Sequence, residues 1–328
     1  MKSHEALIIG ISGPSSSGKT TLARLLQRVF YGVNLNPKDQ CLNTFIIHED
    51  DFYFPDDKIP YTTTRSGAKI QDWDTAAAID IPFLSQALRY VRDKGTLPPR
   101  LRSKEDQNDQ TSSGVSDELV QELRGVVGSR LLDKTGKRKE KTIAFLEGFL
   151  LFAPPRSESE KEEHVLRSVH DAIDLHLFLP AAYELVKARR EGRSGYVTVG
   201  AAPEPPVEST GEGGHGETGM EVDLNAEDDR PPQNFWVDPP GYVDDVVWPR
   251  YVTDHAWLLT TEGEGDDMKG HQALGEADLV RRVGDGTRVR TDVGVEVAPG
   301  WGSAGMDVIL KWAVDLILRY YLDRTLVE

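Results

Sequence analysis

The sequence predicts an α/β fold in which a parallel sheet is covered by helices on both faces. Three observations carry this prediction: short apolar strands alternate with helical segments, the first strand runs into a glycine-rich loop, and a helix follows that loop at once. Such alternation of strands and helices is typical of parallel sheets. Ligands of these sheets bind at the carboxyl ends of the strands, and we expect the functional residues there.

The first strand, residues 6–11, leads into the segment GPSSSGKT at residues 13–20, which fits the phosphate-binding pattern G-x-x-x-x-G-K-[ST]. Its glycines let the backbone wrap a phosphate, and the helix predicted over residues 20–30 directs its positive end at the same oxygens. Lys19 supplies a charge for the β- and γ-phosphates, and Thr20 a hydroxyl for Mg²⁺. The sequence therefore predicts nucleotide binding by Gly13, Ser15, Ser16, Ser17, Gly18, Lys19, Thr20 and Thr21.

The rest of the chain continues the alternation. Further strands are predicted at residues 44–48, 142–146 and 173–179, and helices at residues 75–93, 181–191, 244–259 and 306–322. We expect a loop at 55–69, an irregular segment at 97–141 with a short helix at 116–123, and two strands within 282–297 around Gly284-Asp285-Gly286. The whole chain, 1–328, is expected to form one domain with insertions at about 97–141 and 200–233.

Composition narrows the class of protein. The net charge is −16, which argues against nucleic-acid binding, and no apolar stretch approaches the ~20 residues of a membrane span. The one cysteine, Cys41, excludes an internal disulfide, and the eight scattered histidines show no spacing typical of a metal site. We expect a cytoplasmic protein, and the basic run at 137–139 leaves a nuclear location open.

One acidic segment stands out. Residues 200–232 are rich in Gly, Pro and Glu and contain few large apolar side chains. Such a composition cannot bury enough surface to repay the entropy of ordering, so we expect this segment to be disordered.

Several charged side chains are predicted at one edge of the sheet. Asp50 and Asp51 follow the second strand, Glu147 follows the third, and Arg189 and Arg193 lie at the end of the 181–191 helix. Phosphoryl transfer to a hydroxyl needs a carboxylate to take the proton, an acid to hold Mg²⁺ and mobile arginines to neutralise charge. Each of these residues alone could equally be a helix cap, a solvated turn residue or a complement to the helix dipole. Their joint placement around one edge of the sheet is less easily explained in these ways and favours phosphoryl transfer.

The chain resembles the nicotinamide riboside kinases, relatives of the uridine and pantothenate kinases. The resemblance rests on IIGISGPSSSGKTTLA, HEDDFY, QDWD, LEGFLLF, YELVKARREGR and DPPGYVDDVVWPRY, which occur in family order over most of the chain. It implies a three-layer phosphate-loop kinase fold with a lid at about 189–240. It also implies that ATP and Mg²⁺ are used and that small molecules are the partners.

The resemblance also implies roles for individual residues. Asp51 would take the proton from the ribose 5′-hydroxyl, and Thr20 and Glu147 would hold Mg²⁺. Asp74 would bind the ribose hydroxyls with Arg190 as its partner, whereas Arg189 and Arg193 would face ATP.

For the nicotinamide ring, the resemblance implies three further contacts. Trp73 would stack on the ring, where a cation over an indole face is favourable, and Asp238 would reach toward the carboxamide. Tyr196 matches a second stacking aromatic but lies three residues past the last lid arginine, whereas the family has two. A partly buried aromatic at Trp73, an ordinary loop tyrosine at Tyr196 and a turn residue at Asp238 remain the alternatives.

The function expected from these residues is ATP- and Mg²⁺-dependent phosphorylation of the ribose 5′-hydroxyl of nicotinamide riboside, with nicotinic acid riboside as a second substrate, for NAD synthesis. A uridine- or cytidine-type nucleoside kinase of the same fold is the alternative. A nucleotide-operated switch and a non-catalytic regulator are weaker alternatives, because the chain has no N-K-x-D motif and keeps Lys19, Thr20, Asp51 and Glu147. The sequence leaves the oligomeric state and the choice of ATP or GTP open.

Overall fold

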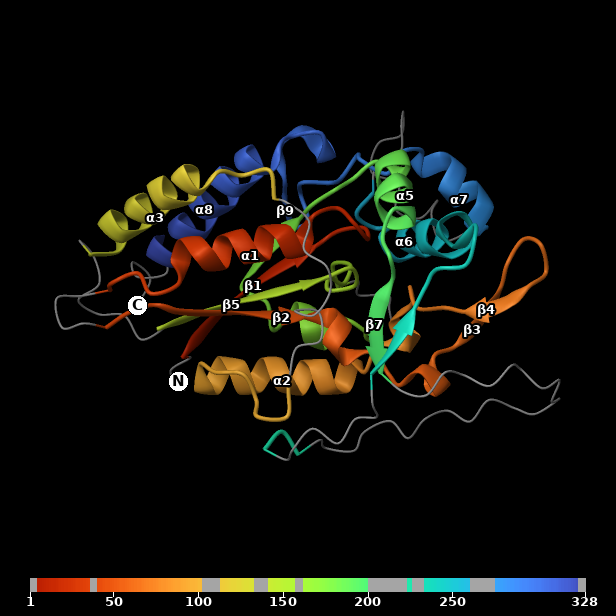
Figure 1. Ribbon diagram of the computed structural model, residues 1–328, viewed down its shortest axis with the longest axis horizontal. Helices are drawn as coiled ribbons and strands as arrows, with labels where there is room; N and C mark the ends of the chain where they lie inside the picture. The colour runs from red at the N-terminus through yellow and green to blue at the C-terminus, as the bar shows by residue number, and fades with distance from the viewer. Residues whose placement is uncertain are drawn as a thin grey trace.

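The centre of the protein is a five-stranded parallel sheet with the order β2-β5-β1-β6-β9 (Figure 1). The structure is a computed structural model that describes residues 5–35, 40–101, 113–132, 141–156, 162–199, 223–225, 233–259 and 275–323. The strands are β1 (Ala6–Ser12), β2 (Asn43–His48), β5 (Thr142–Gly148), β6 (Leu175–Phe178) and β9 (Glu296–Val297). β1 and β5 are buried along their whole length. Strands covered on both faces have continuous apolar sequences of this kind.

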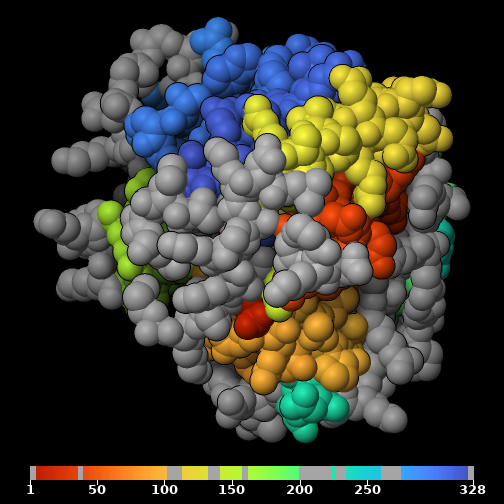
Figure 2. Space-filling view, turned by 90° about the vertical axis from the view of Figure 1, so that its left-hand side faces the viewer, coloured from red at the N-terminus to blue at the C-terminus, as the bar shows by residue number. Residues whose placement is uncertain are grey.

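Helices cover both faces of the sheet and make three layers. One face carries α1 (Lys19–Phe30), α3 (Asp117–Leu132) and α8 (Met306–Asp323), which share one hydrophobic core with the sheet. The other carries α2 (Ile81–Lys94) and α4 (Arg167–His170), whose core continues into α6 (Trp248–Asp254) and α7 (Glu276–Val283). Figure 2 shows the layers end-on, with α3 and α8 above α1 and with α2 on the opposite side. The predicted three-layer α/β fold is confirmed.

Three smaller elements lie beyond the carboxyl ends of the strands (Figure 1). They are α5 (Tyr183–Glu191), the hairpin of β3 (Tyr61–Thr63) with β4 (Lys69–Gln71), and the antiparallel ribbon of β7 (Tyr196–Val199) with β8 (Gln233–Trp236). The β3–β4 hairpin corrects the prediction of a loop at 55–69. The β7–β8 ribbon was not predicted, because its strands are short and far apart in the chain.

The helix predicted at 75–93 begins later than expected, at Ile81. Asp80 is its N-cap, and the side-chain oxygen Oδ1 accepts a hydrogen bond from the backbone N–H of Phe83 at 2.9 Å. A proline in the first turn favours the same start, because it needs no hydrogen-bond partner there. The preceding residues Ala76–Ala78 form a separate 3₁₀ turn.

Two other predictions need correction. The helix predicted at 116–123 is longer, since α3 extends to Leu132. Of the two strands predicted within 282–297, only the short strand Glu296–Val297 is present, and the segment opens instead with the last turn of α7. Gly284, with a φ of 65°, ends α7 in a conformation that glycine adopts readily, so the glycine marks a helix end.

The helix predicted at 244–259 is present with a local distortion, and it ends earlier than expected, at Asp254. A π-helical turn, Val243–Val247, runs directly into α6, and a proline lies in the first turn of α6. Such local departures from the α-helix are typical of helices that contain a proline. Most of the predicted disordered segment 200–232 lies outside the described residues. So do residues 102–112 and 133–140 of the other insertion. In the described stretch 223–225, the carbonyl of Leu224 accepts a hydrogen bond from the N–H of Arg100 at 3.3 Å.

No helix in the described ranges has both the length and the apolar character needed to cross a lipid bilayer.

Candidate active site

The loop between β1 and α1 has the geometry of a phosphate-binding loop. Gly13 has a φ of 152°, and a Cβ at this position would lie 2.3 Å from the carbonyl oxygen of Leu179, so only glycine fits. Gly18 caps α1 with a φ of 101°. Lys19 folds back over the loop, and its Nζ donates a hydrogen bond to the carbonyl of Pro14 at 3.0 Å. Burial lowers the pKa of Lys19 below its ordinary value.

This loop forms one wall of a cavity at the carboxyl edge of the sheet, with about 960 Å³ of space, part of it open to solvent. Most of the predicted site residues line it: Ser15, Ser16, Gly18, Lys19, Thr20, Thr21, Trp73, Asp74, Glu147, Arg190, Arg193 and Tyr196. The lining does not include Gly13, Ser17, Asp51, Arg189 or Asp238. Arg189 still contacts the loop, because its Nη1 donates to the carbonyl of Ser16 at 3.1 Å.

Glu147 lies at the end of β5 beside the phosphate-binding loop. Its Oε1 accepts a hydrogen bond from the hydroxyl of Thr20 at 3.0 Å and lies 2.7 Å from Nδ1 of the buried His48. Burial acts to raise the pKa of Glu147, but the hydrogen bond and charge of His48 and the charge of Lys19 outweigh it, so this pKa lies below its ordinary value. Glu147 therefore stays ionised at neutral pH.

The two aspartates after β2 have different surroundings. Asp50 is exposed and lines the cavity, whereas Asp51 is buried, with 4% exposure, and does not line it. The reason is the 3₁₀ turn Glu49–Phe52 at the end of β2, which points successive side chains in different directions. The structure thus brings Asp50 to the position where Asp51 was predicted.

Asp50 has the properties of a proton acceptor. Although the residue is exposed as a whole, partial desolvation of its carboxylate and, second, the charge of Glu147 raise the pKa of Asp50 to about 6. The neighbouring Glu49 is fully buried, and its Oε2 accepts hydrogen bonds from the backbone N–H groups of Phe149 and Leu150 at 2.7 and 3.0 Å. Burial raises the pKa of Glu49 to about 8.

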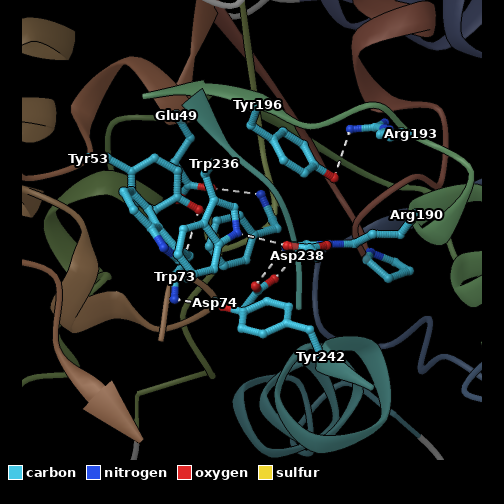
Figure 3. A network of polar contacts seen from close by, with 12 residues as sticks. Glu49, Tyr53, Trp73, Asp74, Arg190, Arg193, Tyr196, Trp236, Asp238 and Tyr242 are labelled. Carbon is cyan, nitrogen blue, oxygen red and sulfur yellow. Dashed lines mark hydrogen bonds and ion pairs between the residues drawn. The ribbon is translucent and has the colours of Figure 1, made fainter. Parts of the chain in front are cut away.

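Arg190 is the centre of a charged cluster at the far end of the cavity (Figure 3). Its Nη1 and Nη2 donate to the two carboxylate oxygens of Asp74 at 2.9 and 3.0 Å, and its Nε donates to Asp238 Oδ2 at 2.7 Å. The rings of Tyr196 and Tyr242 lie 5.3 and 5.5 Å from the guanidinium carbon. The pairing of Asp74 with Arg190 that the resemblance implied is present, and Asp238 joins the same guanidinium.

Aromatic side chains form the remaining wall: Tyr53, Trp73, Phe149, Tyr196 and Trp236. Trp73 is 4% exposed, and its ring centroid lies 5.3 Å from that of Tyr53 and 5.5 Å from that of Trp236. Sequence reasoning did not find Trp236. Its position two residues before Asp238 was the available signal, but nothing in the sequence shows that β8 pairs with β7.

The described residues contain no cluster of three or more His, Cys, Asp or Glu side chains that could hold a metal ion by themselves. The hydroxyl of Thr20 and the carboxylate of Glu147 are oxygen ligands of the kind that Mg²⁺ prefers, and Mg²⁺ bound with a nucleotide takes few protein ligands. The donors present thus fit a Mg²⁺ that is held jointly with nucleotide phosphates.

A phosphate-binding loop on a parallel sheet, with carboxylates at the strand ends and arginines facing the loop, defines a phosphate-loop kinase. Comparison with known proteins agrees. The chain belongs to the phosphoribulokinase / uridine kinase family, whose model matches residues 8–194. Membership of this kinase family implies ATP as the phosphoryl donor.

Curated relatives extend the comparison over most of the chain. A nicotinamide riboside kinase of Schizosaccharomyces pombe is 29% identical over 255 residues, which cover 78% of this chain and 81% of the relative. Nicotinamide riboside kinases of Saccharomyces cerevisiae and Eremothecium gossypii are each 26% identical and cover 79% and 77% of this chain, respectively. These relatives and the family make the chain an enzyme of the nucleoside kinase type.

Proposed function

We propose that this protein transfers the γ-phosphoryl group of ATP to the ribose 5′-hydroxyl of nicotinamide riboside and thereby feeds NAD synthesis. Nicotinic acid riboside is the proposed second substrate. One observation carries the proposal: a single cavity joins the phosphate-binding loop, the Asp74–Arg190 pair and an aromatic wall. A nucleoside bound by its ribose at Asp74 and by its base at the aromatic wall would direct its 5′ end toward the loop. The names of the three relatives support the choice of substrate.

Asp50 is the proposed base. A base with a pKa near 6 is ionised at neutral pH and still accepts a proton readily. This assignment replaces Asp51, which is buried and does not line the cavity. Lys19, Arg189 and Arg193 are the proposed partners of the ATP phosphates, because Lys19 and Arg193 line the cavity and Arg189 contacts the loop.

Thr20 and Glu147 are the residues that would hold Mg²⁺. When bound, Mg²⁺ would neutralise the charge that builds up on the phosphates during transfer. The chain's own contribution is to keep Glu147 ionised through His48 and to hold the Thr20 hydroxyl against it. Trp73 and Asp238 are proposed to bind the base, with a second aromatic side chain of the cavity wall, Tyr196 or Trp236, against the ring. A single domain and a cytoplasmic location remain our expectations.

A substrate panel tests the proposal. The purified protein is assayed with ATP and Mg²⁺ against nicotinamide riboside, nicotinic acid riboside, uridine, cytidine and pantothenate. We expect the highest kcat/KM for nicotinamide riboside. Higher turnover of uridine or cytidine than of both pyridine ribosides would replace the proposal by the alternative of a uridine-type kinase. Nucleotide binding without turnover of any substrate would favour a non-catalytic regulator.

A further inference from the structure

Trp236 is part of the cavity wall although no sequence motif points to it. In the β7–β8 ribbon it lies directly opposite Tyr196, so both rings project from the same face of the ribbon. Its indole is tilted by 46° against that of Trp73, at a centroid distance of 5.5 Å, and also contacts the ring of Tyr242. Figure 3 shows Trp236 between Trp73 and the Arg190 cluster. It therefore lies next to the proposed binding site for the base.

The indole of Trp236 is held in place from two sides. Its Nε1 donates a hydrogen bond to Asp238 Oδ1 at 2.9 Å, and Asp238 in turn binds Arg190. The ribbon behind it is tied to the buried carboxylate of Asp56 by Thr198 and Asn234. A ring held in this way loses little conformational entropy when it binds a ligand.

Tyr196, the other aromatic on this face, already has cations against its ring. The guanidinium carbons of Arg190 and Arg193 lie 5.3 and 5.4 Å from its centroid, and Arg193 also donates to its hydroxyl at 3.2 Å. A positively charged ligand ring stacked there would meet these two cations. Among the described residues, cation–ring contacts involve Tyr196 and Tyr242 at this end of the cavity, and neither Trp73 nor Trp236.

Among the described aromatic side chains of the cavity wall, Tyr53, Phe149 and the two indoles have no cation against their rings. The two indoles differ in how accessible they are. Trp73 is 4% exposed, whereas Trp236 is half-buried. Tryptophan is the most favourable aromatic side chain for a cation.

We propose that Trp236, rather than Tyr196, is the second aromatic side chain that contacts the base, and that it selects a positively charged ring over an uncharged ring of the same shape. This inference rests on the proposed function, because it concerns how the same site chooses its nucleoside. The pyridinium ring of nicotinamide riboside then lies against Trp236 and Trp73, while Tyr196 keeps Arg190 and Arg193 in position.

The test compares nicotinamide riboside with its uncharged isostere, 3-(β-D-ribofuranosyl)benzamide, in which carbon replaces the ring nitrogen. For each compound, kcat/KM and the dissociation constant are measured for the wild type, Trp236→Leu, Trp236→Phe and Tyr196→Leu. Phe235→Leu is the matched control, because Phe235 is the neighbouring residue on β8 and is 53% exposed. Thermal melting checks that each variant is folded.

We expect Trp236→Leu to lower the preference for the cation over its isostere by about 2- to 30-fold, the range of cation–π contacts. Trp236→Phe should retain part of this preference, and Phe235→Leu should match the wild type. Tyr196→Leu should change the preference less than Trp236→Leu does.

Three results would overturn the inference. The first is an equal loss of kcat/KM for both compounds in Trp236→Leu. The second is a larger change of preference in Tyr196→Leu than in Trp236→Leu. The third is a gain in kcat/KM for both compounds in Trp236→Leu, which would show that the indole obstructs the site. Failure of the proposed function itself is distinguishable, because the wild type would then not turn over nicotinamide riboside in the substrate panel.

Discussion

Thr198 donates a hydrogen bond to the buried carboxylate of Asp56 at 3.0 Å, although 142 residues separate the two in the chain. Asn234, which lies opposite Thr198 in the ribbon, donates to the same carboxylate oxygen at 2.8 Å. One side chain, in the 3₁₀ turn Asp56–Lys58 that precedes β3, therefore holds both strands of the β7–β8 ribbon. The ribbon carries Tyr196 and Trp236, so Asp56 sets where the aromatic wall lies.

Replacing Asp56 by alanine should loosen the ribbon and weaken nucleoside binding. Hydrogen bonds to a charged group contribute about 1.5–3 kcal/mol each. We expect Asp56→Ala to lower kcat/KM for the nucleoside by about ten-fold or more, mainly through a higher KM, with a small change in KM for ATP. Steady-state kinetics measure both. Asp57→Ala is the control, because Asp57 is exposed; equal behaviour of the two variants would contradict this role of Asp56.

Asp50→Asn and Asp51→Asn should differ in kcat. Loss of a general base costs about 10²- to 10⁴-fold, and we expect this loss for Asp50→Asn, with ATP affinity nearly unchanged. Asp51→Asn, if it folds as melting experiments would show, should stay within about five-fold of the wild-type kcat. The reverse order of effects would return the role of base to Asp51.

Glu147→Gln should raise the Mg²⁺ requirement. Glu147 is kept ionised by His48 and contacts the Thr20 hydroxyl, and the amide offers no negative charge to the metal. Substitution of a residue that supports a metal site typically lowers the affinity for the metal by about 10- to 100-fold. We therefore expect the half-activating Mg²⁺ concentration to rise by about ten-fold or more. The exposed Glu184 provides the control variant, Glu184→Gln. Identical Mg²⁺ activation curves for Glu147→Gln and the control would remove Glu147 from the metal site.

Acid should destabilise the protein partly through His255. This side chain is 2% exposed and packs between the rings of Tyr251 and Phe178. Burial lowers the pKa of His255 to about 4. The unfolded chain, with a histidine pKa of about 6.5, takes up the proton first as the pH falls. Stability is therefore lost between about pH 6.5 and pH 4.

His255→Phe should reduce this acid sensitivity. Urea denaturation at pH 7.5 and pH 5.5 measures the free energy of unfolding of both proteins. Linkage predicts that the wild type loses about 1 kcal/mol more than the variant over this interval. An equal loss in the two proteins would show that other groups govern the acid response.

The segment between β7 and β8 should be dispensable for turnover. The ribbon pairs Val199 with Gln233, so the two residues that flank the segment 200–232 lie next to each other. Replacing residues 200–232 by Asn-Gly, the residues typical of a two-residue hairpin turn, should keep kcat within about three-fold of the wild type. A loss of ten-fold or more in a folded, monodisperse variant would show that the segment takes part in catalysis.

The sequence alone was sufficient for the features that depend on neighbouring residues. The phosphate-binding loop is encoded in eight consecutive residues, and its glycines have the positive φ values that the loop needs. The strands β1 and β5 are recognisable because burial on both faces requires an unbroken apolar run. Glu147 follows one of these strands directly, so its position at the edge of the sheet could be predicted.

The tertiary structure decided the features that depend on how separate segments meet. Asp50 and Asp51 are adjacent acids, and only the 3₁₀ turn after β2 determines which of them faces the cavity. Trp236 and Asp56 join the site through strand pairing and hydrogen bonds between segments far apart in the chain. Local propensity and spacing carry no information about such contacts, because their free energy is gained only when the distant segments pack together.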